Sequence, residues 1–438
     1  MGTNEEAALK RSRTMYIIQA ALEYLVAILV SGSYFATVTK ELGISDSLTG
    51  ILSSIISLGC LFQILSVSYR RKRVKNMVII LSIVNQVLFG MLYVIPIINL
   101  PSGAKTAMFV IFIISAYVFY NFAHPKKTAW LMSLVDDNKR GSFTANKEII
   151  SLLSGMAFSF GMGALIDYFK SRGEVRIAFI ITALVILTLT VLHTVTLIFS
   201  IEKESRFDDN ESGKGLRGII KSFGEVLRDK GILKVTLLYV IYQIAHYASI
   251  PFFGTYMIGE LAMPLTTVTV LTMLGSVSRI LVSKFWGRYA DKYSFASLIE
   301  KCFFFIAAAF ICVIFATPKT GVIMFALYNI LHGISMGGIN SALTNMIFDY
   351  APTEKRADAL VVSQSAGGVI GFITTLIMSA AVSAIQANGN SFLGISLYAQ
   401  QLASAISLIC IIIATLYVRF VIIRRERECK RYSRGDFE

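Results

Sequence analysis

The sequence predicts an all-α integral membrane protein, built from twelve transmembrane helices in two six-helix bundles. Apolar residues make up 55% of the 438 positions, and charged residues make up only 16%, against about 25% in a typical soluble domain. One bilayer-spanning helix takes about 20 mostly apolar residues, so twelve helices would use about 240 positions, close to the apolar total. This composition excludes a soluble globular enzyme, a disordered chain and a disulfide scaffold.

The apolar residues gather into two sets of six segments. They lie at residues 15–38, 48–69, 77–98, 106–134, 147–168, 176–199, 232–258, 265–285, 297–316, 321–348, 357–386 and 392–422. We therefore expect a cytoplasmic N-terminus (1–14), a first bundle (15–199), a cytoplasmic linker (200–231), a second bundle (232–422) and a basic cytoplasmic tail (423–438).

The linker between the two sets is the longest polar stretch of the chain. Its second part spaces apolar residues as on one helical face, which predicts an amphipathic helix on the membrane surface, although a plain solvated linker is equally compatible. The residues concerned are Leu216, Ile219, Ile220, Phe223 and Leu227.

The basic residues predict the orientation. With both termini in the cytoplasm of a cell, 34 Lys and Arg lie on the cytoplasmic side and six lie opposite, while Arg279 is inside a segment. This bias follows the positive-inside rule and indicates a multi-pass protein of the plasma membrane. The net charge of +14 is therefore no sign of nucleic-acid binding. The five cysteines form no CxxC pair and predict reduced core residues, neither disulfides nor metal ligands.

Two kinds of short polar stretch recur in both halves. Arg140 and Arg356 each open a segment after a short polar stretch, and Gly287, Asp291 and Lys292 follow the eighth segment. Two six-helix halves with such matching loops resemble the major facilitator superfamily of secondary transporters, in its prokaryotic twelve-helix form. In that family the signature loop after helix 8 carries Gly, Asp and Lys at these spacings. Its first copy is degraded here, since Arg70 replaces the aspartate.

The resemblance implies a conformational latch. An aspartate near a helix N-terminus meets unpaired N–H groups and the positive end of the helix dipole. By analogy Asp291, with Gly287 and Lys292, would face Arg140 and the start of helix 5 in one state, with Arg356 at the corresponding place of the second half. The alternative is that Asp291 is only a solvated carboxylate in a loop.

The family's cavity is lined by helices 1, 4, 7 and 10, and each of the corresponding segments carries a polar stripe. On the first segment the stripe consists of Gln19, Glu23 and Tyr34. The others predict substrate-binding residues, because polar side chains that face lipid are costly. These are Tyr117, Asn121, His124, Lys127, Tyr239, Gln243, His246, Asn329, His332 and Asn340. His193, isolated on the sixth segment, is interpreted as a packing residue.

Charges inside the membrane are the sharpest functional signals. Glu23 lies about nine residues into the first segment and could carry a coupling proton, since desolvation disfavours the carboxylate. Arg279 would then be its coupling partner. The alternative is a static ion pair of Glu23 with Arg279 or Lys127. Lys127 and its neighbour Lys126 either make the cavity electropositive, which would suit an anion, or extend to the cytoplasmic interface.

These features predict a secondary active transporter, and not an enzyme, that moves a small polar metabolite such as a sugar or an organic anion. The coupled ion would be a proton or another ion, and alternating access would move the solute through the bilayer. No cofactor or metal is expected, the chain has no nucleotide-binding motif, and a monomer is expected. Proton-antiport drug efflux and a transporter-like sensor without flux are the alternatives.

Overall fold

The computed structural model describes residues 3–59, 61, 73–136, 140–202, 224, 228–352, 355–392 and 394–424. Within these residues ten helices are long and apolar enough to span a membrane, and a bent pair of helices would make an eleventh span. The segment expected at 48–69 begins as α3 (Asp46–Ser54) and η1 (Ile55–Leu58), and most of its remainder lies outside the described residues. The all-α membrane fold is therefore confirmed, and the twelve-helix count is consistent with it.

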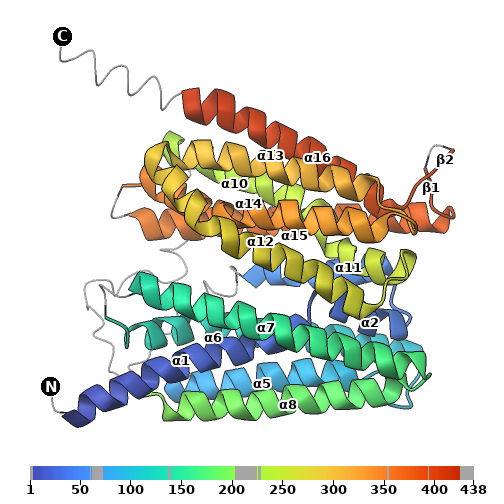
Figure 1. The fold of residues 1–438 in the computed structure, drawn as a ribbon, viewed down its shortest axis with the longest axis horizontal. Coiled ribbons are helices and arrows are strands. Elements are labelled where there is room, and N and C mark those ends of the chain that lie inside the picture. The colour runs from blue at the N-terminus through green and yellow to red at the C-terminus, as the bar shows by residue number, and fades with distance from the viewer. Residues whose placement is uncertain are drawn as a thin grey trace. The chain divides into compact units, whose positions relative to one another are not determined.

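The chain divides into two compact units (Figure 1). Unit 1 comprises Met1–Gly218 and Met263–Thr269, and unit 2 comprises Ile219–Ala262 and Val270–Glu438. The predicted amphipathic helix of the linker lies outside the described residues.

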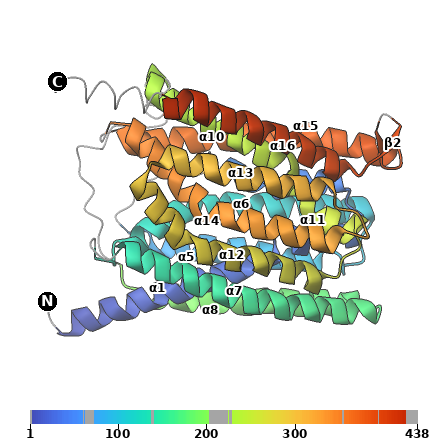
Figure 2. The same cartoon turned by 45° about the horizontal axis from the view of Figure 1, so that its top comes forward.

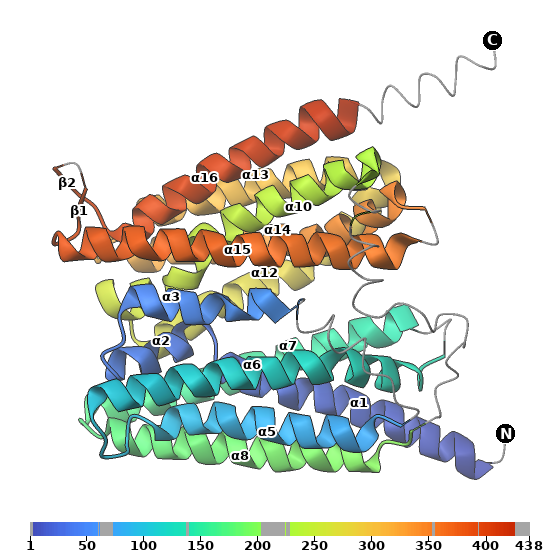
Figure 3. The same cartoon turned by 180° about the vertical axis from the view of Figure 1, so that it is seen from behind.

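Unit 1 contains the first set of helices, of which α5 packs between α6 and α8, as Figure 3 shows, while α1 packs against α7 and α8. Its helices besides α3 and η1 are α1 (Thr3–Leu29), α2 (Gly32–Glu41), α5 (Lys75–Val94), α6 (Ser102–Met132), α7 (Arg140–Ser171) and α8 (Val175–Phe199).

Unit 2 contains the second set, in which α13 lies beside α14 and α16 (Figure 2) and α10 packs against α15 and α16. The elements are α10 (Lys230–Ser249), η4 (Ile250–Phe252), α11 (Phe253–Thr255), η5 (Tyr256–Glu260), α12 (Leu265–Lys292), α13 (Phe295–Ile314), α14 (Gly321–Tyr350), α15 (Arg356–Ala387), β1 (Ser391–Phe392), β2 (Ile395–Ser396), α16 (Ala399–Tyr417) and η7 (Val418–Ile423). The two strands form an antiparallel hairpin, and the first turn of α12 belongs to unit 1.

The first helix differs from its prediction at both ends. It begins at Thr3, and it breaks after Leu29, where a bend of 41° separates α1 from α2. Gly32 starts α2 with a φ of +53°, a left-handed conformation that glycine adopts without a Cβ clash. Tyr34 therefore lies beyond the break, where its hydroxyl donates to the carbonyl of Ser159 on α7, and it does not continue the stripe of Gln19 and Glu23.

The eighth helix also corrects a prediction. Helix α12 continues to Lys292, so Gly287 and Asp291 lie in its last turns and not in a loop. Ser294 accepts the N–H of Ser297 and so caps the start of α13. The next helix can therefore begin almost directly after α12 ends. A connection of two residues is sufficient here.

A close helix crossing in unit 2 leads to the first prediction. A Cβ added to Gly333 on α14 would overlap the backbone carbonyl of Gly275 on α12. Small residues at such crossings allow two membrane helices to approach closely. We expect Gly333→Ala to destabilise the protein by about 1–3 kcal/mol, because the two backbones must separate.

The matched control for this substitution is Gly161→Ala on α7. A Cβ at Gly161 would meet no atom within 4 Å, so we expect no loss of stability. Thermal unfolding of the two purified variants in detergent makes the comparison. If both variants unfold at the same temperature as the unsubstituted protein, the close approach of α12 and α14 does not stabilise the fold.

Candidate functional site

A buried ion pair joins α1 and α6 within unit 1. The Nζ atom of Lys127 lies 2.5 Å from Oε2 of Glu23, and the exposed fractions of the two side chains are 5% and 20%. Of the two ion pairs that the sequence left open for Glu23, the structure forms the one with Lys127. Because a buried charge is costly unless it is paired, each residue requires the other in this state.

The amide of Gln19 is the second partner of the same carboxylate. Its Nε2 donates to Oε2 of Glu23 over 2.7 Å, one helical turn away on α1. The side chains at positions i and i+4 share a helix face, which explains the contact. Gln19 is 1% exposed, so its side of the contact is buried, whereas the Glu23 side chain keeps 20% of its surface exposed.

His193 on α8 contacts the amide of Gln19 and extends this group of side chains. Its Nε2 lies 2.9 Å from Nε2 of Gln19, and the residue is 1% exposed. The other ring nitrogen, Nδ1, is buried without a hydrogen-bond partner in the structure. Thr196, one turn along α8, donates its hydroxyl to the main-chain carbonyl of His193 over 2.6 Å. His193 is therefore a member of the polar cluster and not only a packing residue.

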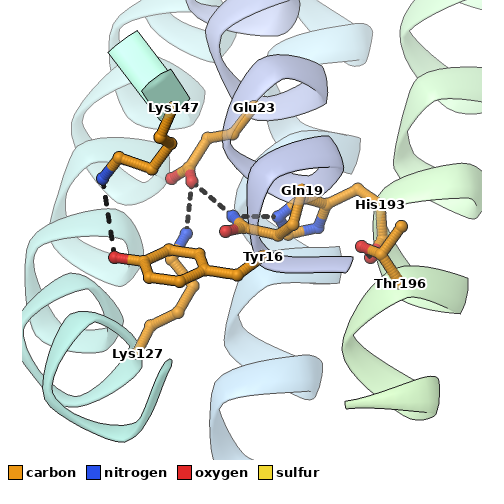
Figure 4. Close-up of polar contacts among 7 residues, drawn as sticks. All are labelled: Tyr16, Gln19, Glu23, Lys127, Lys147, His193 and Thr196. Carbon is orange, nitrogen blue, oxygen red and sulfur yellow. Dashed lines mark hydrogen bonds and ion pairs between the residues drawn. The ribbon is translucent and has the colours of Figure 1, made fainter. Parts of the chain in front are cut away.

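A second ammonium group, that of Lys147 on α7, completes the cluster (Figure 4). Its Nζ lies 3.5 Å from the hydroxyl of Tyr16 and 4.9 Å from the centre of the Tyr16 ring. Tyr16 is itself buried on α1. We call Tyr16, Gln19, Glu23, Lys127, Lys147 and His193 the Glu23 cluster.

The electrostatic balance of the Glu23 cluster is positive. Two ammonium groups, Lys127 and Lys147, meet one carboxylate, Glu23, and no carboxylate of the described part of the chain forms an ion pair with Lys147. Exposed Glu148 also acts electrostatically on Lys147, from the adjacent position of α7. A positive surplus among partly buried side chains favours the binding of an anion.

The position of Lys127 depends on the continuity of α6. Although Pro125 lacks an N–H group, the helix runs through it to Met132, so Lys127 points from a helix and not from a loop. The buried ammonium does not extend to the interface, which was one of its predicted alternatives. Its neighbour Lys126 is only half buried and is not among the groups that act electrostatically on Glu23.

Of the remaining predicted residues of α6, His124 interacts with this cluster, whereas Tyr117 and Asn121 contact other residues of unit 1. The ring of His124 lies 5.0 Å from that of Tyr120 at a tilted angle, and His124 interacts electrostatically with Glu23, while its buried Nδ1 has no hydrogen-bond partner among the described residues. Tyr117 packs edge-on against Phe89 of α5. Buried Asn121 donates to the carbonyl of Tyr117 over 2.9 Å, and a Cβ at Gly59 would overlap its amide.

Within unit 2 the predicted binding residues form an aromatic group on α10 and α14. His332 stacks on Tyr328 at 5.2 Å, and His246 acts electrostatically on it. The ring of Tyr239 and the side chain of Gln243 lie against Gly367 of α15, where an added Cβ would overlap both side chains. The structure thus brings His246 near His332, and it brings Tyr239 and Gln243 together against α15.

The other predicted residues of unit 2 have different surroundings. Asn329 donates to the carbonyl of Phe325 over 2.7 Å, whereas Asn340 is exposed. Arg279 is partly buried on α12 and acts electrostatically on His332.

The predicted latch residues are mostly exposed. Gly287 has open space around its Cα, Asp291 is exposed, and the Nζ of Lys292 lies 5.2 Å from the ring of Tyr293. Arg356 opens α15 as expected, and its Nε donates to the carbonyl of Phe348. Arg140 opens α7, and its side chain lies outside the described residues. The latch itself stays a prediction.

Sequence reasoning did not predict three members of the cluster as site residues, namely Tyr16, Lys147 and His193. His193 is a polar residue within an otherwise apolar span, which is a usable signal. Lys147 lies at the predicted edge of its segment, where a lysine usually only marks the membrane interface. Only the packing of α7 and α8 against α1 brings the two to Glu23.

These observations define a polytopic helical membrane protein with a charged cluster inside its first helical unit. The chain belongs to the major facilitator superfamily, because the sequence profile described as "Major Facilitator Superfamily" matches residues 16–375. The chain is therefore a membrane transporter of this class. None of the curated protein sequences significantly matches it.

Solved structures of other transporters share the fold at low identity. A mutant form of the nucleoside transporter NupG aligns with a TM-score of 0.68 and 11% identity, covering 93% of this chain and 99% of that chain. The POT family transporter PepTSo aligns with a TM-score of 0.64 and 12% identity, covering 93% of this chain and 98% of that chain. A bacterial homolog of the human lysosomal transporter Spinster aligns with a TM-score of 0.61 and 12% identity, covering 95% and 97%.

Proposed function

We propose that the protein is a proton-coupled symporter that carries a small organic anion across the cell membrane by alternating access. The termini lie in the cytoplasm, and one chain suffices for transport. The single observation that carries this proposal is the pairing of Glu23 with Lys127 beside a second ammonium, that of Lys147. Here the carboxylate supplies the proton site, and the two ammonium groups supply the anion site.

The charge balance explains why proton and anion would travel together. In the empty state Glu23 neutralises Lys127, and Lys147 is left with one net positive charge. When an anion binds the ammonium of Lys127, Glu23 loses its partner and accepts a proton from water, since an unpaired buried carboxylate is costly. A monoanion and a proton together leave the net charge of the cluster unchanged.

Recognition of the rest of the solute would fall to neutral polar residues. His124 on α6 interacts electrostatically with Glu23, and the amide of Gln19 on α1 contacts the same carboxylate. Such groups set orientation and specificity in sites that are otherwise apolar. Transporters of similar fold carry nucleosides and peptides according to their names, so both classes belong in a ligand screen.

The test begins with thermal-shift measurements of the purified protein at pH 5.5 and 7.5. The probes are citrate, lactate, glycerol 3-phosphate, uridine, glucose, dialanine and the cationic drug tetraphenylphosphonium. A ligand at 100 times its dissociation constant stabilises the folded state by about 2.7 kcal/mol. We expect the largest shift with an organic anion at the lower pH.

Uptake of the stabilising probe into proteoliposomes then separates the functions. Accumulation of the anion driven by an inward proton gradient supports the proposal. Stabilisation by glucose or uridine alone contradicts the anion class, and stabilisation by tetraphenylphosphonium alone favours drug efflux. Binding without any flux favours a sensor.

Lys147→Met provides a residue-level prediction. Removal of the Lys147 ammonium should weaken binding of the anionic probe about 10-fold or more, because a hydrogen-bonded ion pair with a charged ligand contributes about 1.5–3 kcal/mol. The matched control is Lys126→Met, which removes the ammonium of half-buried Lys126 on α6. Isothermal titration makes the measurement, and equal affinities for both variants would remove Lys147 from the anion site.

A further inference from the structure

We propose that His193 is a positioning residue for the proton site, and that it acts on Glu23 through the amide of Gln19. This inference rests on the proposed role of Glu23 in proton coupling. The three side chains form one line of hydrogen bonds from α1 to α8 (Figure 4), in which Gln19 Nε2 contacts both Glu23 and His193.

The geometry determines which way the amide of Gln19 must point. An ionised carboxylate is an acceptor only, so the group 2.7 Å from Glu23 must be the amide nitrogen and not the amide oxygen. The ammonium of Lys127 lies 2.5 Å from the same oxygen and can only donate, so this oxygen is an acceptor. One hydrogen of the amide is therefore directed at Glu23.

The second hydrogen of the same amide identifies the tautomer of His193. It is directed at Nε2 of the imidazole over 2.9 Å, so Nε2 must be the acceptor. A histidine that accepts at Nε2 is neutral and carries its proton on Nδ1. That Nδ1 is buried without a hydrogen-bond partner in the structure. The fold thus leaves one N–H group unsatisfied to hold the Gln19 amide in its orientation.

The orientation of the amide matters because it selects the charged form of Glu23. An amide nitrogen donates to a carboxylate, whereas an amide oxygen accepts from a protonated carboxyl group. In this tautomer His193 opposes rotation of the amide, because rotation would bring Oε1 against the lone pair of Nε2 unless the imidazole also moved its proton from Nδ1 to Nε2. The site therefore binds its proton only at a lower pH than it would without His193.

Other charged groups surround this line of hydrogen bonds without replacing it. Lys127 on α6 and Glu23 on α1 act electrostatically on His193, and His124 on α6 acts on Glu23. Lys147 on α7 contacts the Tyr16 hydroxyl and also interacts electrostatically with Glu23. The nearby end of α5 carries Lys75, whose ammonium instead bonds the carbonyl groups of Ile198 and Ser200. Only Gln19 connects His193 to Glu23 by hydrogen bonds that the structure describes.

The experiment measures protonation of Glu23 in the full-length protein without any ligand. Infrared difference spectra between pH values show the carbonyl band of a protonated carboxyl group, and Glu23→Gln identifies the band by removing it. In His193→Leu we expect the midpoint of this band to rise by about one pH unit, a tenfold change in proton affinity. In His193→Gln, whose Oε1 can accept from Gln19, we expect a midpoint within a few tenths of the original.

Thr196→Val is the matched control on α8. It removes a hydroxyl that bonds only the main chain of His193, so the midpoint should not move. An unchanged midpoint in His193→Leu would overturn the positioning role. If no band depends on Glu23 at all, the proposed proton coupling fails instead, so the two failures are distinguishable.

A second measurement reports directly on the imidazole of the unsubstituted protein. The ¹⁵N shifts of histidine in the labelled protein, recorded at a pH above the Glu23 midpoint, report which ring nitrogen carries the proton. We expect one buried neutral histidine protonated at Nδ1, whose signals disappear in His193→Gln. An Nε2-protonated or doubly protonated His193 would overturn the inference.

Discussion

Lys127→Met should destabilise the protein by about 3–5 kcal/mol at neutral pH, the largest effect expected of any single substitution in the Glu23 cluster. The reason is that the carboxylate of Glu23 would lose the ammonium 2.5 Å away and remain as an uncompensated charge between α1 and α6. The amide of Gln19 would be its only remaining hydrogen-bond donor among the described contacts. Urea or thermal unfolding in detergent measures the loss.

The double variant Glu23→Gln/Lys127→Met tests the cause. Removing both charges removes the unpaired charge, so we expect most of the lost stability to return. The contrasting control is Asp136→Asn, which breaks the exposed pair of Arg13 and Asp136 and should cost less than about 1 kcal/mol. If the double variant is as unstable as Lys127→Met, the lysine stabilises through packing and not through the ion pair.

Glu23→Gln should abolish uphill accumulation of the transported anion while exchange of that anion continues. Glutamine keeps the size and the hydrogen-bonding capacity of a protonated glutamate, but it cannot release a proton. For a one-to-one symport of proton and monoanion, a gradient of one pH unit supports about tenfold accumulation. The variant should accumulate the anion no higher than its external concentration.

Exchange and accumulation are measured in the same proteoliposomes. Radiolabelled anion is exchanged against unlabelled anion without a pH gradient, and is then taken up under an inward proton gradient. Loss of both activities would indicate that Glu23 serves the fold or the binding step. Full accumulation in Glu23→Gln would place the proton site elsewhere and refute the coupling role.

The membrane architecture could be predicted from the sequence because it follows from solvent chemistry. An apolar segment of about 20 residues has few alternatives to spanning as a helix, and so the segment predicted at 176–199 closely matches α8, Val175–Phe199. The start of α1 was misplaced for the same reason. Its first turns are polar and helical, and hydropathy marks only the part that is expected in the membrane.

The Glu23 cluster could be predicted only in part. The depth of Glu23 and Lys127 in their segments marked both as unusual, because charge inside a membrane is costly. Their pairing was one of two possibilities, since helical periodicity places a residue on a face but does not identify the helix opposite that face.

The sequence by itself therefore determined the class of protein, the approximate spans and the residues that are too polar for lipid. Only the tertiary structure decided that Lys127, 104 residues from Glu23, pairs with it, that Lys147 contacts Tyr16, and that His193 contacts Gln19. The physical reason is that burial is a property of each segment, whereas a hydrogen bond depends on the packing of α1 against α7 and α8 to within a fraction of an ångström.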